Sequence, residues 1–134
     1  MTSKNTRVLV VDDEEDLREL ISAELMLKGY EVFMAENGLK AMEVLKQEHI
    51  DVVVSDIRMP KMNGIELLDA IKTLSYIPMV MMISAYSSTV TEDELKAKGA
   101  LCLIPKPFRL KQVISVLEEN LKSWNRVPHQ KTAA

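Results

Sequence analysis

The chain has 134 residues, of which 47% are hydrophobic and 28% are charged, and its net charge is -3. This length is that of one ordinary domain whose core needs no disulfide or metal, and the composition excludes a disordered chain. The acidic balance lacks the basic patch of a nucleic-acid-binding protein, and the longest apolar stretch is shorter than the roughly 18 residues of a membrane span.

Apolar runs alternate with helical spacing along the chain. Arg7 to Val11 is a β-branched run, and the apolar residues after it recur at helical intervals up to Lys28. Four further repeats predict strands and helices in pairs, at Glu31–Met34 and Leu39–Lys46, Asp51–Ser55 and Ile65–Thr73, Met79–Ser84 and Thr89–Lys98, and Leu101–Ile104 and Leu110–Trp124. No periodicity follows, so we expect one domain at residues 1–123 and a C-terminal tail or truncated linker at 124–134.

The predicted strands show no polar alternation. Such strands are buried on both faces, which is typical of a parallel sheet covered by crossover helices. With right-handed crossovers, the repeat predicts an α/β fold: a flavodoxin-like, doubly wound sheet of five parallel strands in the order 2-1-3-4-5, with five helices. In this order the binding crevice lies beyond the carboxyl ends of the first and third strands.

Acidic residues follow both of those strands. Asp12 and Asp13 come directly after the first strand, and Asp56 comes after the third. Two like charges about 4 Å apart repel by roughly 4 kcal/mol at an effective dielectric of 20, so this group favours a bound cation or a shared proton. Oxygen ligands without His or Cys indicate Mg²⁺. The next three acids are interpreted as negative charges near a helix N-terminus, where the helix dipole favours them: Glu14, Glu15 and Asp16.

Three strand ends carry groups suited to phosphoryl chemistry. Asp56 alone is most often a cap, but a carboxylate attacks phosphorus when a metal shields the incoming negative charge. Lys106 lies between two prolines, and its ammonium group is suited to pair with Asp56 and then with a transferred phosphoryl group. Ser84 ends the fourth strand as either a phosphoryl ligand or an ordinary turn residue.

Four motifs carry a family resemblance. VLVVDDEEDLREL, VVVSDIRMPKMNGIELL, MMISAY and IPKPF, in this order, resemble the receiver domains of two-component response regulators, including the chemotaxis regulators. The resemblance covers about Arg7 to Ser123. It implies a phosphorelay switch that accepts a phosphoryl group from a partner's phosphohistidine with Mg²⁺ and then hydrolyses its aspartyl phosphate slowly. Such a protein is a signalling switch with modest self-phosphorylation activity and not a metabolic enzyme.

The resemblance assigns a metal site. It implies that Asp56 is the phosphoacceptor and a metal ligand, that Asp13 binds Mg²⁺ directly, and that Asp12 acts through water. The main-chain carbonyl of Arg58 matches the third protein ligand.

Two further positions match the family and one departs from it. Ser84 matches the switch hydroxyl and Lys106 the lysine that contacts the phosphoryl group. The family's switch aromatic usually lies three residues before this lysine, where the chain has Leu103. Leu103 keeps a second hypothesis open, that of a non-phosphorylated pseudo-receiver acting as a constitutive protein-docking module.

The resemblance also implies partners: a sensor histidine kinase or histidine phosphotransfer protein, and a downstream effector protein or a missing output domain. Direct contact with nucleic acid and membrane insertion are not expected. Cys102 is the single cysteine, and the N-terminus shows no export signal, so we expect a cytoplasmic protein. An aspartate-nucleophile phosphatase needs Asp-x-Asp after the first strand, and a flavodoxin needs a hydroxyl-rich loop there, so neither fits.

Overall fold

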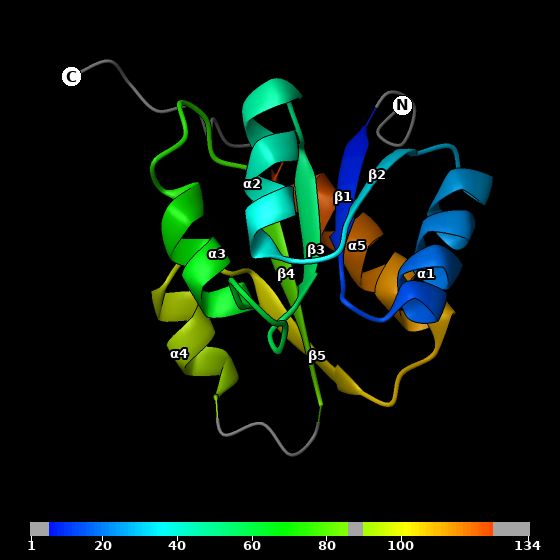
Figure 1. The fold of residues 1–134 in the computed structure, drawn as a ribbon. Coiled ribbons are helices and arrows are strands. Elements are labelled where there is room, and N and C mark those ends of the chain that lie inside the picture. The colour runs from blue at the N-terminus through cyan, green and yellow to red at the C-terminus, as the bar shows by residue number, and fades with distance from the viewer. Residues whose placement is uncertain (1–5, 86–89, 125–134) are drawn as a thin grey trace.

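The computed structural model describes residues 6–85 and 90–124. In that part of the chain, strands alternate with helices: β1 (Arg7–Val11), α1 (Glu15–Leu27), β2 (Glu31–Ala35), α2 (Gly38–Gln47), β3 (Val52–Asp56), α3 (Gly64–Ile71), β4 (Met79–Ala85), α4 (Glu92–Ala97), β5 (Cys102–Lys106) and α5 (Leu110–Trp124). The strands form one sheet in the order β2-β1-β3-β4-β5, and every pair is parallel (Figure 1). The predicted fold is confirmed.

The sheet is apolar on both faces because helices cover both of them. Along β1, Val8 and Val10 pack in the core under α1 and α5, while Leu9 and Val11 pack in the core under α2, α3 and α4. Burial of each such side chain favours folding by about 1.5–3 kcal/mol. Within the described ranges, no helix has the length and apolar content to cross a membrane.

Four strands end later than the sequence predicts, and the differences at β3 and β5 concern site residues. β3 runs from Val52 to Asp56, so Asp56 is the last residue of a fully buried strand and not the first residue of a loop. β5 runs to Lys106 and includes Pro105. A proline is tolerated there because β5 is an edge strand, where a missing N–H group breaks no ladder bond.

The fourth helix begins later than the predicted Thr89, which lies outside the described residues. Thr91 is the N-cap: its side chain accepts a hydrogen bond from the Glu94 N–H group, and the Glu94 carboxylate accepts one from the Thr91 N–H group. This capping box satisfies two N–H groups that a helix start otherwise leaves unpaired, so it fixes the first helical residue at Glu92.

Candidate functional site

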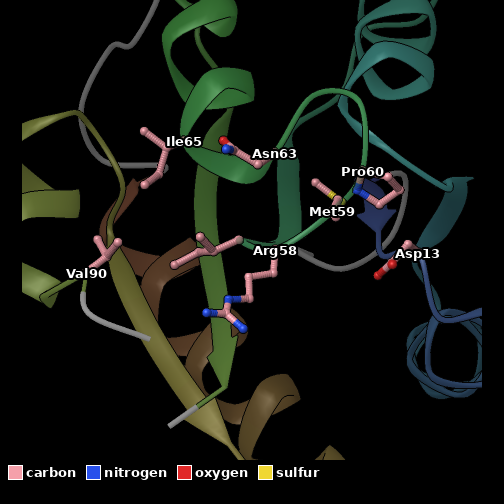
Figure 2. A pocket seen from close by; sticks show the side chains of 8 residues that line it. Asp13, Arg58, Met59, Pro60, Asn63, Ile65 and Val90 are labelled. Atoms are coloured by element: carbon pink, nitrogen blue, oxygen red, sulfur yellow. The ribbon is translucent and has the colours of Figure 1, made fainter. Parts of the chain in front are cut away.

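An open cavity of about 530 Å³ lies beyond the carboxyl ends of β1 and β3 (Figure 2). Asp13 borders it on the β1 side, Arg58 and Asn63 border it from the loop between β3 and α3, and Val90 borders it from the residues before α4. This is the crevice position that the strand order predicts, because the order of the strands in the sheet reverses between β1 and β3.

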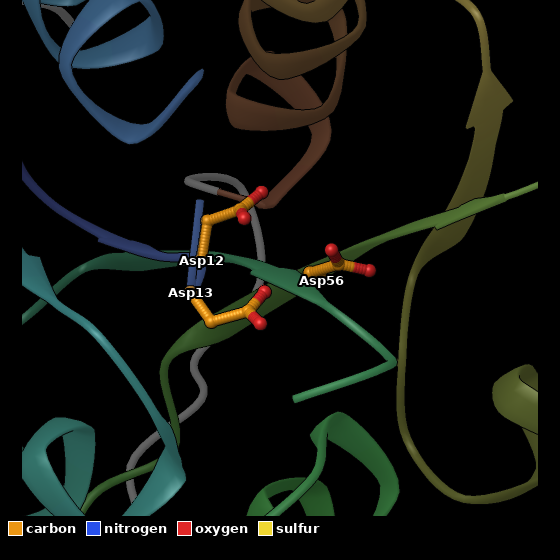
Figure 3. Close-up of side chains that lie close together, drawn as sticks. All are labelled: Asp12, Asp13 and Asp56. Atoms are coloured by element: carbon orange, nitrogen blue, oxygen red, sulfur yellow. The ribbon is translucent and has the colours of Figure 1, made fainter. Parts of the chain in front are cut away.

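Three carboxylates converge beside this cavity. β1 and β3 pair with Val11 opposite Ser55, so the residues that follow Val11 reach the same edge of the sheet as Asp56. One carboxylate oxygen from each of Asp12, Asp13 and Asp56 lies within 4.8 Å of the others (Figure 3). The predicted acidic group is therefore assembled by the topology of the sheet.

The carboxylate of Asp12 is buried and only partly hydrogen-bonded. The residue is 1% exposed, and its Oδ1 accepts a hydrogen bond of 2.8 Å from the Glu14 N–H group. Its Oδ2 is buried without a hydrogen-bond partner among the described residues. Burial, together with the nearby charge of Asp56, raises the pKa of Asp12 to about 6, although the hydrogen bond from the Glu14 N–H group opposes this shift. A cation bound at this point would offset both the burial of the Asp12 charge and its repulsion by Asp56.

The donor set fits a hard divalent cation. It consists of carboxylate oxygens, one of which is buried and lacks a partner, and it includes no nitrogen or sulfur ligand. Mg²⁺ prefers such oxygens and keeps several waters, so it suits a site that is buried at Asp12 and exposed at Asp13.

Mg²⁺ is expected to raise the melting temperature of the protein at pH 7.5, because it screens the repulsion among the three acids. Since the pKa of Asp12 is raised to about 6 without metal, protons compete with the cation, and the apparent Mg²⁺ affinity should fall as the pH drops below 6. Calorimetric or thermal-shift titrations from pH 5 to 8 measure this. In the control variant Asp13→Asn, the stabilisation by Mg²⁺ should be largely lost; a gain equal to that of the unmodified chain contradicts the site.

Lys106 supplies positive charge to the same edge. Its Nζ lies 3.0 Å from Asp56 Oδ2 and 3.3 Å from Glu14 Oε1. Burial alone lowers the pKa of Lys106, but the hydrogen bond and the charge of Asp56 outweigh burial and raise it, so the ammonium group stays charged. The predicted pairing of Lys106 with Asp56 is present, and the Lys106–Pro107 peptide bond is cis.

The loop after Asp56 is held tightly against the strand end. The Arg58 N–H group donates to Asp56 Oδ1 at 3.3 Å, and the Gly64 N–H group donates to the Ile57 carbonyl at 2.8 Å. A Cβ atom on Gly64 would lie 2.5 Å from the Asp56 carbonyl oxygen and 2.8 Å from Ile57 Cα, so glycine is required for this close approach. Gly64 thus allows the loop to pack closely against the end of β3 that carries Asp56.

Ser84 belongs to the strand beside Asp56. Asp56 pairs with Ile83 in the β3–β4 register, and Ser84 follows Ile83 and pairs with Pro105 of β5. Ser84 is buried, with 3% of the residue exposed. Ser84 is therefore at the same edge of the sheet, between the strand of Asp56 and the strand of Lys106.

Two contacts near the site were not predicted from the sequence. The sequence pattern places Glu14 only at the helix N-terminus, but its carboxylate makes no cap bond and contacts Lys106 instead. Leu103 donates its backbone N–H to Glu92 Oε2 at 2.9 Å. Each contact joins segments that are distant in sequence or in separate elements, so neither has a local sequence signal.

The comparison with protein families gives one match over most of the chain. The family model described as the response regulator receiver domain matches residues 8–118. Sporulation initiation phosphotransferase F of Bacillus subtilis (strain 168) is 32% identical over 117 residues, which cover 87% of this chain and 94% of that protein.

Longer relatives and solved structures agree. Regulatory protein AtoC of Escherichia coli (strain K12) is 35% identical over 122 residues, which cover 91% of this chain but only 26% of AtoC. The CheY-like receiver domain protein of Methanospirillum hungatei JF-1 superposes with a TM-score of 0.83 at 26% identity, covering 92% of this chain and 98% of that one. Chemotaxis response regulator CheY4 of Vibrio cholerae superposes with a TM-score of 0.79 at 31% identity, covering 87% of this chain and 98% of that one.

Proposed function

This chain belongs to the receiver-domain family of two-component response regulators, and on that premise we propose that Asp56 is its phosphoacceptor. The observation that supports this most strongly is the position of the Asp56 carboxylate. It is the only one of the three clustered acids among the described residues that also pairs with Lys106, at 3.0 Å. A carboxylate held between a cation-binding acid pair and an ammonium group is suited to receive a dianionic group.

The proposed reaction is a transfer of one phosphoryl group. A carboxylate oxygen of Asp56 forms a bond to phosphorus, and the bond from phosphorus to the donor's leaving atom breaks, with its electron pair departing on the donor. Mg²⁺, when bound, supplies charge neutralisation for the transferred oxygens. We assign it to Asp12, Asp13, Asp56 and the Arg58 carbonyl.

The residues of this chain have separate tasks in that reaction. The Arg58 N–H group orients Asp56 by donating to Oδ1, and Lys106 balances the charge that the phosphoryl group adds. Ser84 is proposed to donate its hydroxyl proton in a hydrogen bond to a phosphoryl oxygen. Its place between the strands of Asp56 and Lys106 supports this role.

The partners follow from this chemistry. We propose a phosphohistidine on a sensor kinase or phosphotransfer protein as the donor, and an effector protein or a further domain as the recipient of the signal. Added charge at Asp56 shifts the protein between two states of a surface that binds the effector. Slow hydrolysis of the acyl phosphate resets the switch, and a cytoplasmic location is consistent with a kinase as donor.

Incubation with acetyl phosphate and Mg²⁺ tests the proposal. Intact-protein mass spectrometry is expected to show a gain of one phosphoryl group that depends on Mg²⁺ and disappears with EDTA. A wild-type protein that stays unmodified after the Mg²⁺ titration has shown metal binding would overturn the proposal in favour of the pseudo-receiver.

One position departs from the family pattern, although the relatives of this chain favour the phosphorylated switch over the pseudo-receiver. Leu103 stands where the family's switch aromatic usually lies, and it is partly buried against the core under α2, α3 and α4. We propose that Leu103 weakens or reroutes coupling between Asp56 and the face made by α4, β5 and α5.

The substitution Leu103→Tyr is expected to increase the dependence of effector binding on phosphorylation severalfold, because a ring restores a group that changes position with the switch. Binding of the effector to phosphorylated and unphosphorylated protein measures this ratio, with Leu101→Tyr as the control on the residue before the same strand. The idea is abandoned if Leu103→Tyr changes neither the affinity nor its dependence on phosphorylation.

A further inference from the structure

Lys106 is shared between two carboxylates, one of which has no assigned task. Asp56 Oδ2 lies 3.0 Å from Lys106 Nζ and Glu14 Oε1 lies 3.3 Å from it. The Lys106 side chain is 23% exposed, whereas that of Glu14 is 64% exposed. The ammonium group is therefore held at the boundary between the buried phosphoacceptor and an anion at the mouth of the site.

The backbone fixes Glu14 in this place. Its N–H group donates to Asp12 Oδ1 at 2.8 Å, and its extended backbone conformation precedes α1. Its side chain makes no capping bond with α1, although the N-cap position normally favours one. The carboxylate that would cap the helix instead contacts a lysine 92 residues further along the chain.

We propose that Glu14 is a positioning residue that restrains Lys106 and slows phosphorylation of Asp56. This inference rests on the proposed function. An incoming phosphoryl group needs the full charge of the ammonium group, so Lys106 must give up its contact with Glu14 as the O–P bond forms. The contact of Glu14 with Lys106 is present before the reaction and weakened in the transition state. It therefore stabilises the starting state more than the transition state and lowers the rate.

A general effect of negative charge is the alternative, and Glu15 separates the two. Glu15 is the first residue of α1, exposed, and carries the same charge one position further along the chain. Its repulsion of a phosphodonor acts through the solvent, whereas Glu14 acts through a contact with Lys106. The two substitutions remove equal charge and differ in that contact.

The test compares Glu14→Gln with Glu15→Gln at saturating Mg²⁺, using initial rates of phosphorylation by acetyl phosphate. Exposed ion pairs change equilibria by about two- to fivefold, so Glu14→Gln is expected to accelerate the reaction by that factor and Glu15→Gln by clearly less. In a Lys106→Gln background the additional acceleration from Glu14→Gln should vanish.

Equal acceleration by the two substitutions, or an unchanged effect of Glu14→Gln in the Lys106→Gln background, overturns this inference while leaving the proposed function intact. A wild-type protein that gains no phosphoryl group overturns the proposed function itself. Melting temperatures of all four variants show whether a rate change reflects folding.

A second contact carries an independent inference at the position of Leu103. The Leu103 N–H group donates to Glu92 Oε2 at 2.9 Å, across the outer edge of the sheet. Glu92 is the first residue of α4, and the Thr91–Glu94 capping box fixes that helix start. Lys106 is the last residue of the same five-residue strand as Leu103.

We infer that the Glu92–Leu103 bond fastens α4 to β5 and changes when Asp56 is phosphorylated. The strand is held near its start by the bond of Leu103 to Glu92 and at its last residue by the bond of Lys106 to Asp56. A phosphoryl group on Asp56 draws Lys106 toward it and shifts β5 against α4. The Glu92–Leu103 bond then does what a switch aromatic does in other receivers. This inference rests on the proposed function.

Amide hydrogen exchange at Leu103, followed by NMR, tests this device. Glu92→Ala is expected to speed exchange of that amide by about tenfold, because a bond to a charged acceptor is lost, whereas Asp93→Ala on the next residue leaves it unchanged. In the wild type, phosphorylation verified by mass should also change the exchange rate. No effect of Glu92→Ala overturns the bond, and no effect of verified phosphorylation overturns the coupling.

Discussion

Replacing Asp56 by asparagine is expected to abolish the phosphoryl gain from acetyl phosphate and from any histidine-phosphorylated partner. Asparagine keeps the size of the side chain and can still accept the hydrogen bond from the Arg58 N–H group, which is 3.3 Å long in the wild type. It lacks the carboxylate that attacks phosphorus and that holds Lys106 at 3.0 Å. The reaction loses its nucleophile, so no residual rate through this position is expected.

Asp69→Asn is the matched control for this substitution. Asp69 is an exposed acid on α3 whose carboxylate lies 3.8 Å from Lys72 Nζ. It should leave the phosphoryl gain unchanged, and circular dichroism should show a native fold for both variants. An equal gain on Asp56→Asn and wild type contradicts the assignment of the phosphoacceptor.

Replacing Gly64 by alanine is expected to damage both stability and phosphorylation. The added Cβ atom would lie 2.5 Å from the Asp56 carbonyl oxygen and 2.8 Å from Ile57 Cα, and backbone atoms cannot move aside as a flexible side chain can. Overpacking of this kind costs roughly 1–3 kcal/mol in the free energy of unfolding. Relief of the clash must displace the end of β3, so the phosphorylation rate and the Mg²⁺ affinity should fall together.

Gly99→Ala separates the loss of stability from the damage to the site. Gly99 has a φ of 109°, and a Cβ atom there meets nothing within 4 Å, so alanine is strained by its backbone conformation alone. It should cost roughly 1–2 kcal/mol of stability and leave the phosphorylation rate unchanged. Denaturant unfolding and phosphorylation rates measure both effects; a normal rate and Mg²⁺ affinity in Gly64→Ala would contradict the proposed support of Asp56.

The fold was predictable because its sequence signals extend over whole strands and helices. Uninterrupted apolar strands such as Val52–Val54 are needed only where helices cover both faces of a sheet, and the short connections then leave few topologies. The acidic group was predictable for the same reason, since parallel order alone brings the ends of β1 and β3 together. Asp12, Asp13 and Asp56 needed no knowledge of side-chain packing to be placed near one another.

The remaining features depend on packing or on a local signal that was overlooked. The contact of Glu14 with Lys106 depends on the bend before α1 and on the reach of two side chains, neither of which a sequence pattern records. The start of α4 did have a signal, because Thr91 and Glu94 form the spacing of a capping box. Periodicity alone placed the helix start too early.

Identification of the modified residue tests the central claim most directly. An acyl phosphate on aspartate is reduced by borohydride to the alcohol homoserine, so treatment of the phosphorylated protein followed by peptide mass spectrometry marks the acceptor permanently. We predict homoserine at position 56, and only in samples that received both acetyl phosphate and Mg²⁺. Reduction at Asp12 or Asp13, or a phosphoryl group on a residue other than an aspartate, would contradict it.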